Sequence, residues 1–486
     1  DGRLYFNFGN AGRQIKNAKG ETIIDMAGNR VESNRQPYQE GMVFRCNPDG
    51  SDFETLGWNF RNNWMVTVDS FGSIWQSDND DDGNKGVRIN YVMEFGNYGY
   101  KDELTGAGWK TKRTGWHDEI PLRHWHQNDP GVVPNLLQTG QGSPTGICVY
   151  EGDLLPKEFQ GQMIHCDAGP SVVRAYPVKP NGAGYTAGII NVLEGARDRW
   201  FRPADVKVAP DGSLIVADWY DPGVGGHNAG HIESGRLFRV APKGNNDYRQ
   251  PNLDFTSIEG CIAALKNPNN AVRHAAWTEL NRRGETAKAA LDKMASDPNE
   301  RFRARALWLL ATVEGNTMNA VTKAIGDRSP QIRVLALRMA RKHRLDVIPF
   351  VKELARDTSP YVRGECAIAL RHNKSPEAAN LWSDLAQQHS GKDRWYLEAL
   401  GIGADRQSEL FFNNWLKKIG PTWNTPAGRD IIWRIHTPAA CALIARIVTD
   451  PKTLPEGKDR YIRALDFIPA GREKEEALAA IALGNL

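Results

Sequence analysis

A short motif recurs every 30 residues in the second half of the chain and restricts the folds open to it. Each copy begins with a polar turn that contains proline, continues to an arginine, and has a small residue three positions later. Asp or Asn in such a turn can cap a helix, and the small residue lets a neighbouring helix approach closely. A period of this length holds one helix pair, so the pattern predicts stacked helix pairs. The four copies are Asn267–Arg273, Asp297–Arg303, Asp327–Arg333 and Asp357–Arg363, followed by Ala276, Ala306, Ala336 and Cys366.

The period and the motif resemble those of HEAT repeats. We therefore expect residues 254–486 to form an α-solenoid of HEAT-like repeats, with weaker copies beginning at Asp393 and Asp459. Such an array presents an extended surface, so we expect it to dock a protein partner or an electron-acceptor domain.

Residues 1–244 show the pattern of an all-β protein, with short alternating runs between Gly, Pro, Asn and Asp turns. A turn-then-strand unit begins at Gly2, Gly72 and Gly212, and we place a further copy at 146–166. Strand units that recur at long intervals predict propeller blades. We count about four blades. A closed ring needs more, so we expect that the N-terminal part of the propeller is missing, and that residues 245–253 are a linker.

Composition excludes several classes of function. The net charge of +3 does not support nucleic-acid binding, and no run approaches the about 18 apolar residues of a membrane-spanning helix. The six cysteines form no CxxC or CxxCH, which excludes a zinc ribbon, a thioredoxin motif and covalent c-type haem within these residues. We expect them to be buried free thiols.

The first candidate site is the pair Arg61 and Asn62, which precedes a predicted strand. A guanidinium beside an amide can recognise a carboxylate or the oxygens of an ortho-quinone through paired hydrogen bonds. The alternative is an arginine that only bonds one blade to the next. Arg202 precedes a strand of the last blade in the same way, so both arginines are expected to face a central channel.

The second candidate is the acidic loop that begins at Asp78. Asp78, Asp80 and Asp82 alternate along it before Gly83, as in the first half of a calcium loop. The twelfth position is Ile89 instead of Glu, and strands flank the loop, so an EF-hand is not expected. A calcium site of another geometry and a solvated acidic turn both remain open.

Three histidines are weaker candidates. His227 lies in a Gly-rich loop after the last blade's strand and is a candidate base or ligand contact, although a loop histidine without a visible partner is more often structural. His124 and His126 flank Trp125 in an insertion that is expected to lie over the channel mouth, where a metal site is the weaker interpretation.

Several of these residues resemble the soluble glucose/sorbosone dehydrogenase family, whose members are six-bladed propellers that use pyrroloquinoline quinone (PQQ) with calcium. The whole chain resembles HEAT-bearing relatives of that family, often described as membrane-bound dehydrogenases, which frequently carry a C-terminal c-type haem domain. The resemblance therefore implies a partial, N-terminally truncated propeller of the six-bladed type, followed by an α-solenoid. It rests on Arg61-Asn62, Val66–Asp69, Gly72, Gln76–Asp78 and Gly96–Tyr100.

The resemblance also implies roles for individual residues. Arg61 and Asn62 would bind the quinone oxygens, with Arg202 as a looser match. The family's calcium loop corresponds to Asn79, Asp80 and Asp81, with Asp78 and Asp82 beside them. The family has a cationic group where this chain has Asp167-Ala168-Gly169, and the catalytic histidine is expected upstream of Asp1.

We therefore expect a PQQ- and calcium-dependent dehydrogenase acting on a sugar or alcohol, which passes electrons to a c-type haem or another acceptor. The fragment itself is expected to be inactive, and the family implies a periplasmic or extracellular location. One alternative is a non-catalytic propeller–HEAT scaffold that binds carbohydrate or protein and holds calcium structurally. Another is a propeller lactonase, for which the chain lacks an obvious set of metal ligands.

Overall fold

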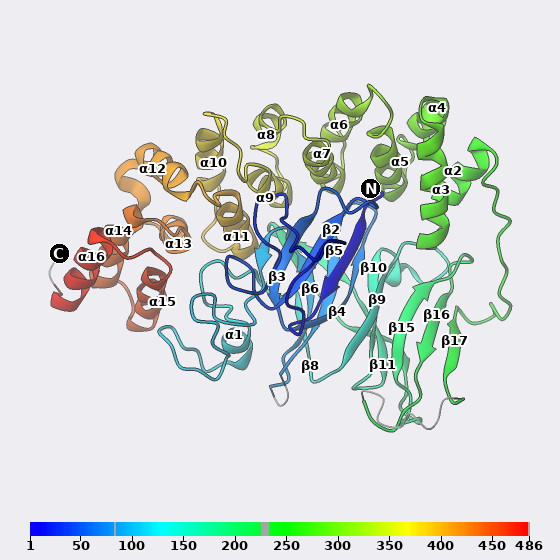
Figure 1. Cartoon of the computed structure of the whole chain (residues 1–486), viewed down its shortest axis with the longest axis horizontal. Coiled ribbons are helices and arrows are strands. Elements are labelled where there is room, and N and C mark those ends of the chain that lie inside the picture. Colours follow the sequence, from blue (N-terminus) through cyan, green and yellow to red (C-terminus); the bar gives the residue numbers. More distant parts are fainter. Residues whose placement is uncertain (82–83, 225–232, 485–486) are drawn as a thin grey trace.

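A computed structural model describes residues 1–81, 84–224 and 233–484 of the chain. Four β-sheets occupy one half of the molecule, and a row of helices runs along their upper side and down past one end (Figure 1). The last strand ends at Val240, and the first helix of the row begins at Ile258.

The sheets are formed by strands that follow one another closely in sequence, as expected for blades. Three sheets have four strands, the fourth has three, and all pairs in them are antiparallel except β3 with β7. In sheet order they are β1 (Leu4–Phe8), β2 (Gly41–Cys46), β3 (Glu54–Phe60) and β7 (Gly96–Asn97); β4 (Asn62–Val68), β5 (Ile74–Asn79), β6 (Val87–Val92) and β8 (Leu137–Gly140); β9 (Pro144–Tyr150), β10 (Gln162–Asp167), β11 (Val172–Tyr176) and β14 (Ile190–Glu194); and β15 (Pro203–Val208), β16 (Leu214–Asp218) and β17 (Arg236–Val240).

The sheets are arranged as in a β-propeller. β4, β9 and β15 each begin a sheet and lie side by side in that order, with β1 against the free side of β4. Neighbouring sheets therefore meet through these strands, as blades meet around an axis. Among the described residues the row runs from β1 to β15 without closing into a ring.

The helices of the row begin at the predicted period. α3, α5, α7 and α9 start at Asn270, Glu300, Pro330 and Pro360, 30 residues apart. The helices are α1 (Ile120–His124, in the β half), α2 (Ile258–Leu265), α3 (Asn270–Arg283), α4 (Glu285–Met294), α5 (Glu300–Leu310), α6 (Thr317–Ile325), α7 (Pro330–Lys342), α8 (Ile348–Leu354), α9 (Pro360–Ala369), α10 (Ala378–Ala386), α11 (Arg394–Gly403), α12 (Ser408–Ile419), α13 (Pro426–Arg434), α14 (Cys441–Thr449), α15 (Pro455–Asp466) and α16 (Arg472–Leu483), with 3₁₀ turns at Lys157–Phe159, Gly420–Trp423 and Pro438–Ala440.

The repeated arginine joins one repeat to the next. Arg303 donates two hydrogen bonds to Asp327 of the following copy, at 2.9 and 3.0 Å, and Arg333 makes the same pair with Asp357. Helix capping differs from the expectation. The first Asp or Asn of the motif accepts a backbone N–H two residues later, and the residue in that later position, such as Asn269, caps the helix.

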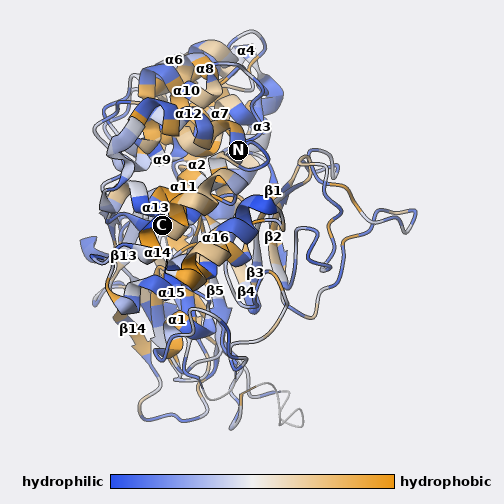
Figure 2. Ribbon diagram, turned by 90° about the vertical axis from the view of Figure 1, so that its left-hand side faces the viewer, coloured by the Kyte–Doolittle hydropathy of each residue, from blue (hydrophilic) through white to orange (hydrophobic). Residues whose placement is uncertain are grey.

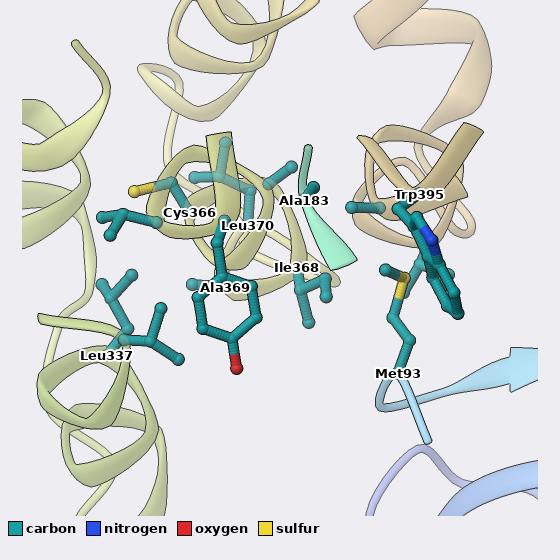
Figure 3. Packing of buried hydrophobic residues seen from close by; sticks show 14 of the residues in the cluster. Met93, Ala183, Leu337, Cys366, Ile368, Ala369, Leu370 and Trp395 are labelled. Carbon is teal, nitrogen blue, oxygen red and sulfur yellow. The ribbon is translucent and has the colours of Figure 1, made fainter. Parts of the chain in front are cut away.

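Buried hydrophobic residues of the helices form one cluster with residues of the sheets. Figure 2 shows hydrophobic residues on helices and strands of both halves. A hairpin of β12 (Val178–Asn181) and β13 (Gly184–Ala187) leaves the third sheet and enters the helical half. Figure 3 shows Ala183, at the tip of this hairpin, among Ile368, Leu370 and Trp395. One hydrophobic core therefore spans both halves of the molecule.

All six cysteines are buried and free, as expected. No helix in the described part of the chain combines the length and the apolar character that crossing a membrane requires.

Glu151 is the main charged contact between the sheets and the helices. Its fully buried carboxylate accepts the backbone N–H and the hydroxyl of Ser70 at 2.9 and 2.8 Å. From the helical half it pairs with Arg273, Arg301 and Arg305, at 3.0 to 3.3 Å. Burial alone would raise the pKa of Glu151, but the three guanidinium groups hold it at about 2.

We predict that Glu151→Gln destabilises the protein by about 3–5 kcal/mol, because it leaves buried arginines without a counter-ion. Urea unfolding of this variant beside Glu158→Gln, a change at an exposed glutamate, measures the effect. Equal stability of the two variants would contradict the role assigned to Glu151.

The same carboxylate predicts a dependence of stability on pH. Its pKa is lower in the folded state than in the unfolded chain, so it stabilises the fold above about pH 4.5 and loses this contribution as the pH falls towards 2. The difference in unfolding free energy between the wild type and Glu151→Gln should therefore shrink between pH 5 and pH 2, which urea titrations at several pH values test.

Candidate functional site

Asp78 organises the start of the second sheet. Its side chain is fully buried and accepts the backbone N–H groups of Arg61 and Asn62, at 3.2 and 2.8 Å. Arg88, on the neighbouring strand β6, donates to it from Nε and Nη2 at 3.1 and 2.8 Å. Burial raises the pKa of Asp78, and Arg88 opposes that rise. Asp78 therefore holds the backbone of Arg61 and Asn62 where β3 passes into β4.

The same arrangement recurs at the last sheet. Arg202 donates its backbone N–H to Asp218 at 2.8 Å, and Arg236, on the next strand, pairs with Asp218 at 2.6 Å. The equivalence of Arg61 and Arg202 thus has a structural basis, because each lies before the first strand of its sheet and is held by an aspartate at the end of the second strand.

The third sheet has a looser version of this arrangement. Ser143 donates its backbone N–H to Asp167 at 2.7 Å, and Arg174 on β11 lies 3.8 Å from the same carboxylate. Burial raises the pKa of Asp167 to about 6. A cation therefore stands beside Asp167-Ala168-Gly169, although the sequence around these residues does not suggest one.

The guanidinium of Arg61 lies beside the acidic loop, with Nε 3.4 Å from Asp81. Tyr100 and Trp109 also donate to Asp81, each at 3.0 Å. Asp80 accepts the backbone N–H of Gly86 at 2.8 Å, and burial raises its pKa. The structure therefore brings Arg61 and the acidic loop together at one end of the second sheet.

The carboxylates of this loop do not fit a calcium cage. Both oxygens of Asp78 accept hydrogen bonds from backbone N–H groups and Arg88, so in this structure Asp78 is a structural anchor, and its role as a metal ligand stays a prediction. Asn79 accepts the backbone N–H of Asp80, and Asp81 accepts two hydrogen bonds and forms an ion pair with Arg61. Asp82 lies outside the described residues, and within the described ranges no group of three His, Cys, Asp or Glu side chains could hold a metal ion.

Arg202 reaches towards the β10–β11 turn. It donates to the Ser171 hydroxyl at 2.6 Å and to the carbonyl groups of Pro222 and Gly223 at 3.2 and 3.4 Å. None of these hydrogen-bond partners carries a negative charge, although Arg202 is near enough to Asp198 to help lower the pKa of that carboxyl. His227, the weaker catalytic candidate, lies outside the described residues.

His124 and His126 are buried neutral side chains. Burial lowers the pKa of His124 to about 2 and that of His126 to about 4. Asn84 donates to His124 Nδ1 at 2.6 Å, and His126 Nδ1 donates to the Gly99 carbonyl at 2.7 Å. These contacts give both rings a structural role in holding the insertion against β6 and β7.

Sequence reasoning missed the residues that complete this site, which are Arg88, Tyr100, Trp109 and Arg174. An alternating strand with a charged residue on its buried face was the available signal for Arg88. No local signal marks Tyr100 and Trp109, whose partner Asp81 lies 19 and 28 residues away, whereas Arg174 is only one hairpin away from Asp167.

We predict that Asp78→Asn costs about 3–5 kcal/mol of stability, since it leaves the fully buried Arg88 without its counter-ion. Thermal unfolding compared with Asp153→Asn, a change at an exposed aspartate, checks this. A melting temperature unchanged by Asp78→Asn would show that the pair with Arg88 does not anchor the sheet.

Comparison with known proteins gives one family match. The model described as "Domain of unknown function (DUF7133)" matches residues 1–244. No curated protein matches the chain.

Solved structures with partial similarity include the PQQ-bound aldose sugar dehydrogenase of Streptomyces coelicolor, with 16% identity and a TM-score of 0.31 over 49% of this chain and 58% of that enzyme. The apo-form of the soluble aldose sugar dehydrogenase of Escherichia coli matches with 17% identity and a TM-score of 0.31 over 50% of this chain and 61% of that one. A glucose dehydrogenase matches with 14% identity and a TM-score of 0.32 over 50% and 61%. The chain thus spans about three fifths of the length of these proteins.

Proposed function

The chain belongs to the family of the DUF7133 domain, and from that premise we propose that its β half binds an anionic quinone of the PQQ type at Arg61 and Asn62. The observation that carries the proposal is the backbone anchor on Asp78, which holds both residues at the start of β4. An anchored guanidinium beside an amide suits paired hydrogen bonds to the oxygens of a planar quinone.

Two further cations support an anionic ligand at this end of the sheets. Arg202 precedes β15 as Arg61 precedes β4, and its described partners are uncharged. Arg174 lies 3.8 Å from Asp167. Arg174 and Arg202 therefore both stand near the β10–β11 turn.

A bound quinone of this type supplies the capacity to accept a hydride from a sugar or alcohol. This chain's own residues would bind and orient it, with Arg61 and Asn62 at its oxygens and Arg202 as an additional cation. The described carboxylates do not form a calcium cage, so the proposal assigns calcium no role here.

The proposed activity of the protein is dehydrogenation of a sugar or alcohol, with a c-type haem domain or another group as the electron acceptor. The helical half would be a HEAT-type solenoid that docks the electron acceptor. The resemblance to the soluble glucose/sorbosone dehydrogenase family also implies, in this proposal, a periplasmic or extracellular location.

A second function, a non-catalytic scaffold, is favoured by one observation. The carboxylates near Arg61 are already paired with protein donors, as in a structural network, and Asp81 neutralises Arg61 itself. In this alternative the propeller-like half binds a protein or carbohydrate without a cofactor.

Titration of the chain with PQQ, followed by the quinone absorbance, distinguishes the two functions. We predict saturable binding that Arg61→Ala weakens by about tenfold or more, since a hydrogen bond to a charged group is lost. Arg30→Ala removes a guanidinium that is exposed and far from this site in sequence, and should leave binding unchanged. Absence of an absorbance change, or equal affinity of wild type and Arg61→Ala, would favour the scaffold. Sugar-dependent reduction of a dye by the protein in the presence of PQQ tests the proposed dehydrogenase activity separately.

A further inference from the structure

A cavity of about 410 Å³ lies between the first sheet and the later helices. The loop between β1 and β2, strand β3, the segment after β7, the turn from α11 to α12 and the C-terminal end of α13 form its walls. Of the other charged groups that line it, Arg371 pairs with Asp405 at 2.9 Å, and Arg406 donates to the Ala27 carbonyl and to Asn29. Neither Arg61 nor Arg202 lines it, so it is separate from the proposed quinone site.

Three polar side chains converge on one point of the wall, at Gly131. A Cβ placed on this glycine would lie 3.8 Å from His436 Cε1, 3.9 Å from Arg434 Cζ and 3.9 Å from Glu103 Oε2. Gly131 has φ +95°, a conformation that disfavours other residues, and the absence of a side chain leaves the space between the three groups open.

Glu103 and Arg434 carry opposite charges that the protein does not fully compensate. Among the described contacts, Glu103 accepts one hydrogen bond, from Asn97 at 2.9 Å, and makes no ion pair. Arg434 bonds through Nε to Glu398 at 2.5 Å, but Glu398 is shared with Arg394 at 2.8 Å, so two guanidinium groups share one carboxylate. Burial raises the pKa of Glu103 to about 7, so about half of this carboxyl is charged at neutral pH, and an ammonium group beside it would favour the charged form.

Two neutral polar groups of the lining have no hydrogen-bond partner in the described structure. One is the hydroxyl of Thr55, a residue only 2% exposed, and the other is Nε2 of His436. Burial lowers the pKa of His436 to about 3, so the ring is neutral. Buried polar groups without partners are costly, which favours a ligand that supplies the missing hydrogen bonds.

The rest of the lining includes the aromatic side chains of Tyr38, Trp58 and Phe95. These can cover an apolar group of the ligand, while the polar groups bind its charged end.

We infer that this cavity binds a small zwitterion of the α-amino acid class, with its ammonium group at Glu103, its carboxylate at Arg434 and its apolar side chain against the aromatic wall. A purely anionic ligand would leave Glu103 unpaired, and a purely cationic one would lie beside Arg434. An α-amino acid carries an ammonium group and a carboxylate on the same carbon, so it can pair with Glu103 and Arg434 at once.

Isothermal titration of the chain with phenylalanine tests the inference, with phenethylamine and 3-phenylpropionate as analogues that each lack one charge. Phenylalanine is expected to bind at least about tenfold more tightly than either analogue, because each analogue leaves one charged group unpaired. A comparison of glycine with leucine tests the aromatic wall, and leucine is expected to bind more tightly because it has an apolar side chain. Glucose, a neutral polyol, serves as a control ligand.

Two variants tie binding to the cavity without removing a structural contact. Glu103→Gln keeps the shape of the side chain, and Thr55→Val removes a hydroxyl that has no partner, so both should remain folded. Each is expected to weaken phenylalanine binding, Glu103→Gln by about tenfold, with unchanged melting temperature. The matched controls Glu158→Gln and Thr186→Val change exposed residues and should bind like the wild type.

Absence of binding of any amino acid at about 10 mM, which is on the order of the affinity of a weak ligand, would overturn the inference. Equal affinity for phenylalanine and its two analogues, or binding of glucose alone, would overturn it as well. So would an unchanged affinity for phenylalanine in Glu103→Gln.

Discussion

Buried carboxylates that pair with arginines hold the two halves of this molecule together. Glu151, Glu94 and Glu365 lie along the junction of sheets and helices with at most 3% of each side chain exposed. Glu94 pairs with Arg45 from β2 and with Arg341 from α7, both at 2.7 Å. A buried charge is tolerated only when partners compensate it, so Glu94 and Glu151, which lie in the β half and pair with helical arginines, tie the position of the sheets to that of the helices. Glu365 extends this network within the helical half, because it shares Arg341 with Glu94.

A carboxylate paired with an arginine also organises one end of each of three sheets. An aspartate at the end of the second strand accepts a backbone N–H from the residue before the first strand and pairs with an arginine on the third. The arrangement closes one end of each sheet, and it also fixes the residues before the first strand. Where those residues are Arg61 or Arg202, a structural anchor positions a cation at the sheet end. If the proposed quinone binds there, Asp78 and Asp218 link stability to ligand recognition.

The two halves together create a cavity that neither would form alone. Thr55, Trp58 and Glu103 come from the β half, and Arg434 and His436 from the helical half. Their side chains meet because the core continues across the junction, with the β12–β13 hairpin inserted among α9 and α11. The helical row thus contributes side chains to an internal site, besides any surface that it offers to a partner.

Much of the architecture could be predicted from local patterns. The 30-residue period places the starts of α3, α5, α7 and α9, and the alternating runs after Gly72, Gly146 and Gly212 fall on β5, β9 and β16. These features follow from backbone geometry and from contacts between neighbours in sequence, which a periodic pattern records directly. Arg61 beside the acidic loop was also foreseeable, since one hairpin joins them.

The sequence by itself determined the secondary structure, the division into a β half and a helical half, and the residue pairs within a hairpin. Only the tertiary structure decided that Glu151 meets three arginines of the helical half, that Trp109 reaches Asp81, and that Glu103 and Arg434 face one point of a cavity wall. The physical reason is that these outcomes depend on which charged groups are buried together. Burial of that kind is set by contacts between segments up to hundreds of residues apart, which no local pattern contains.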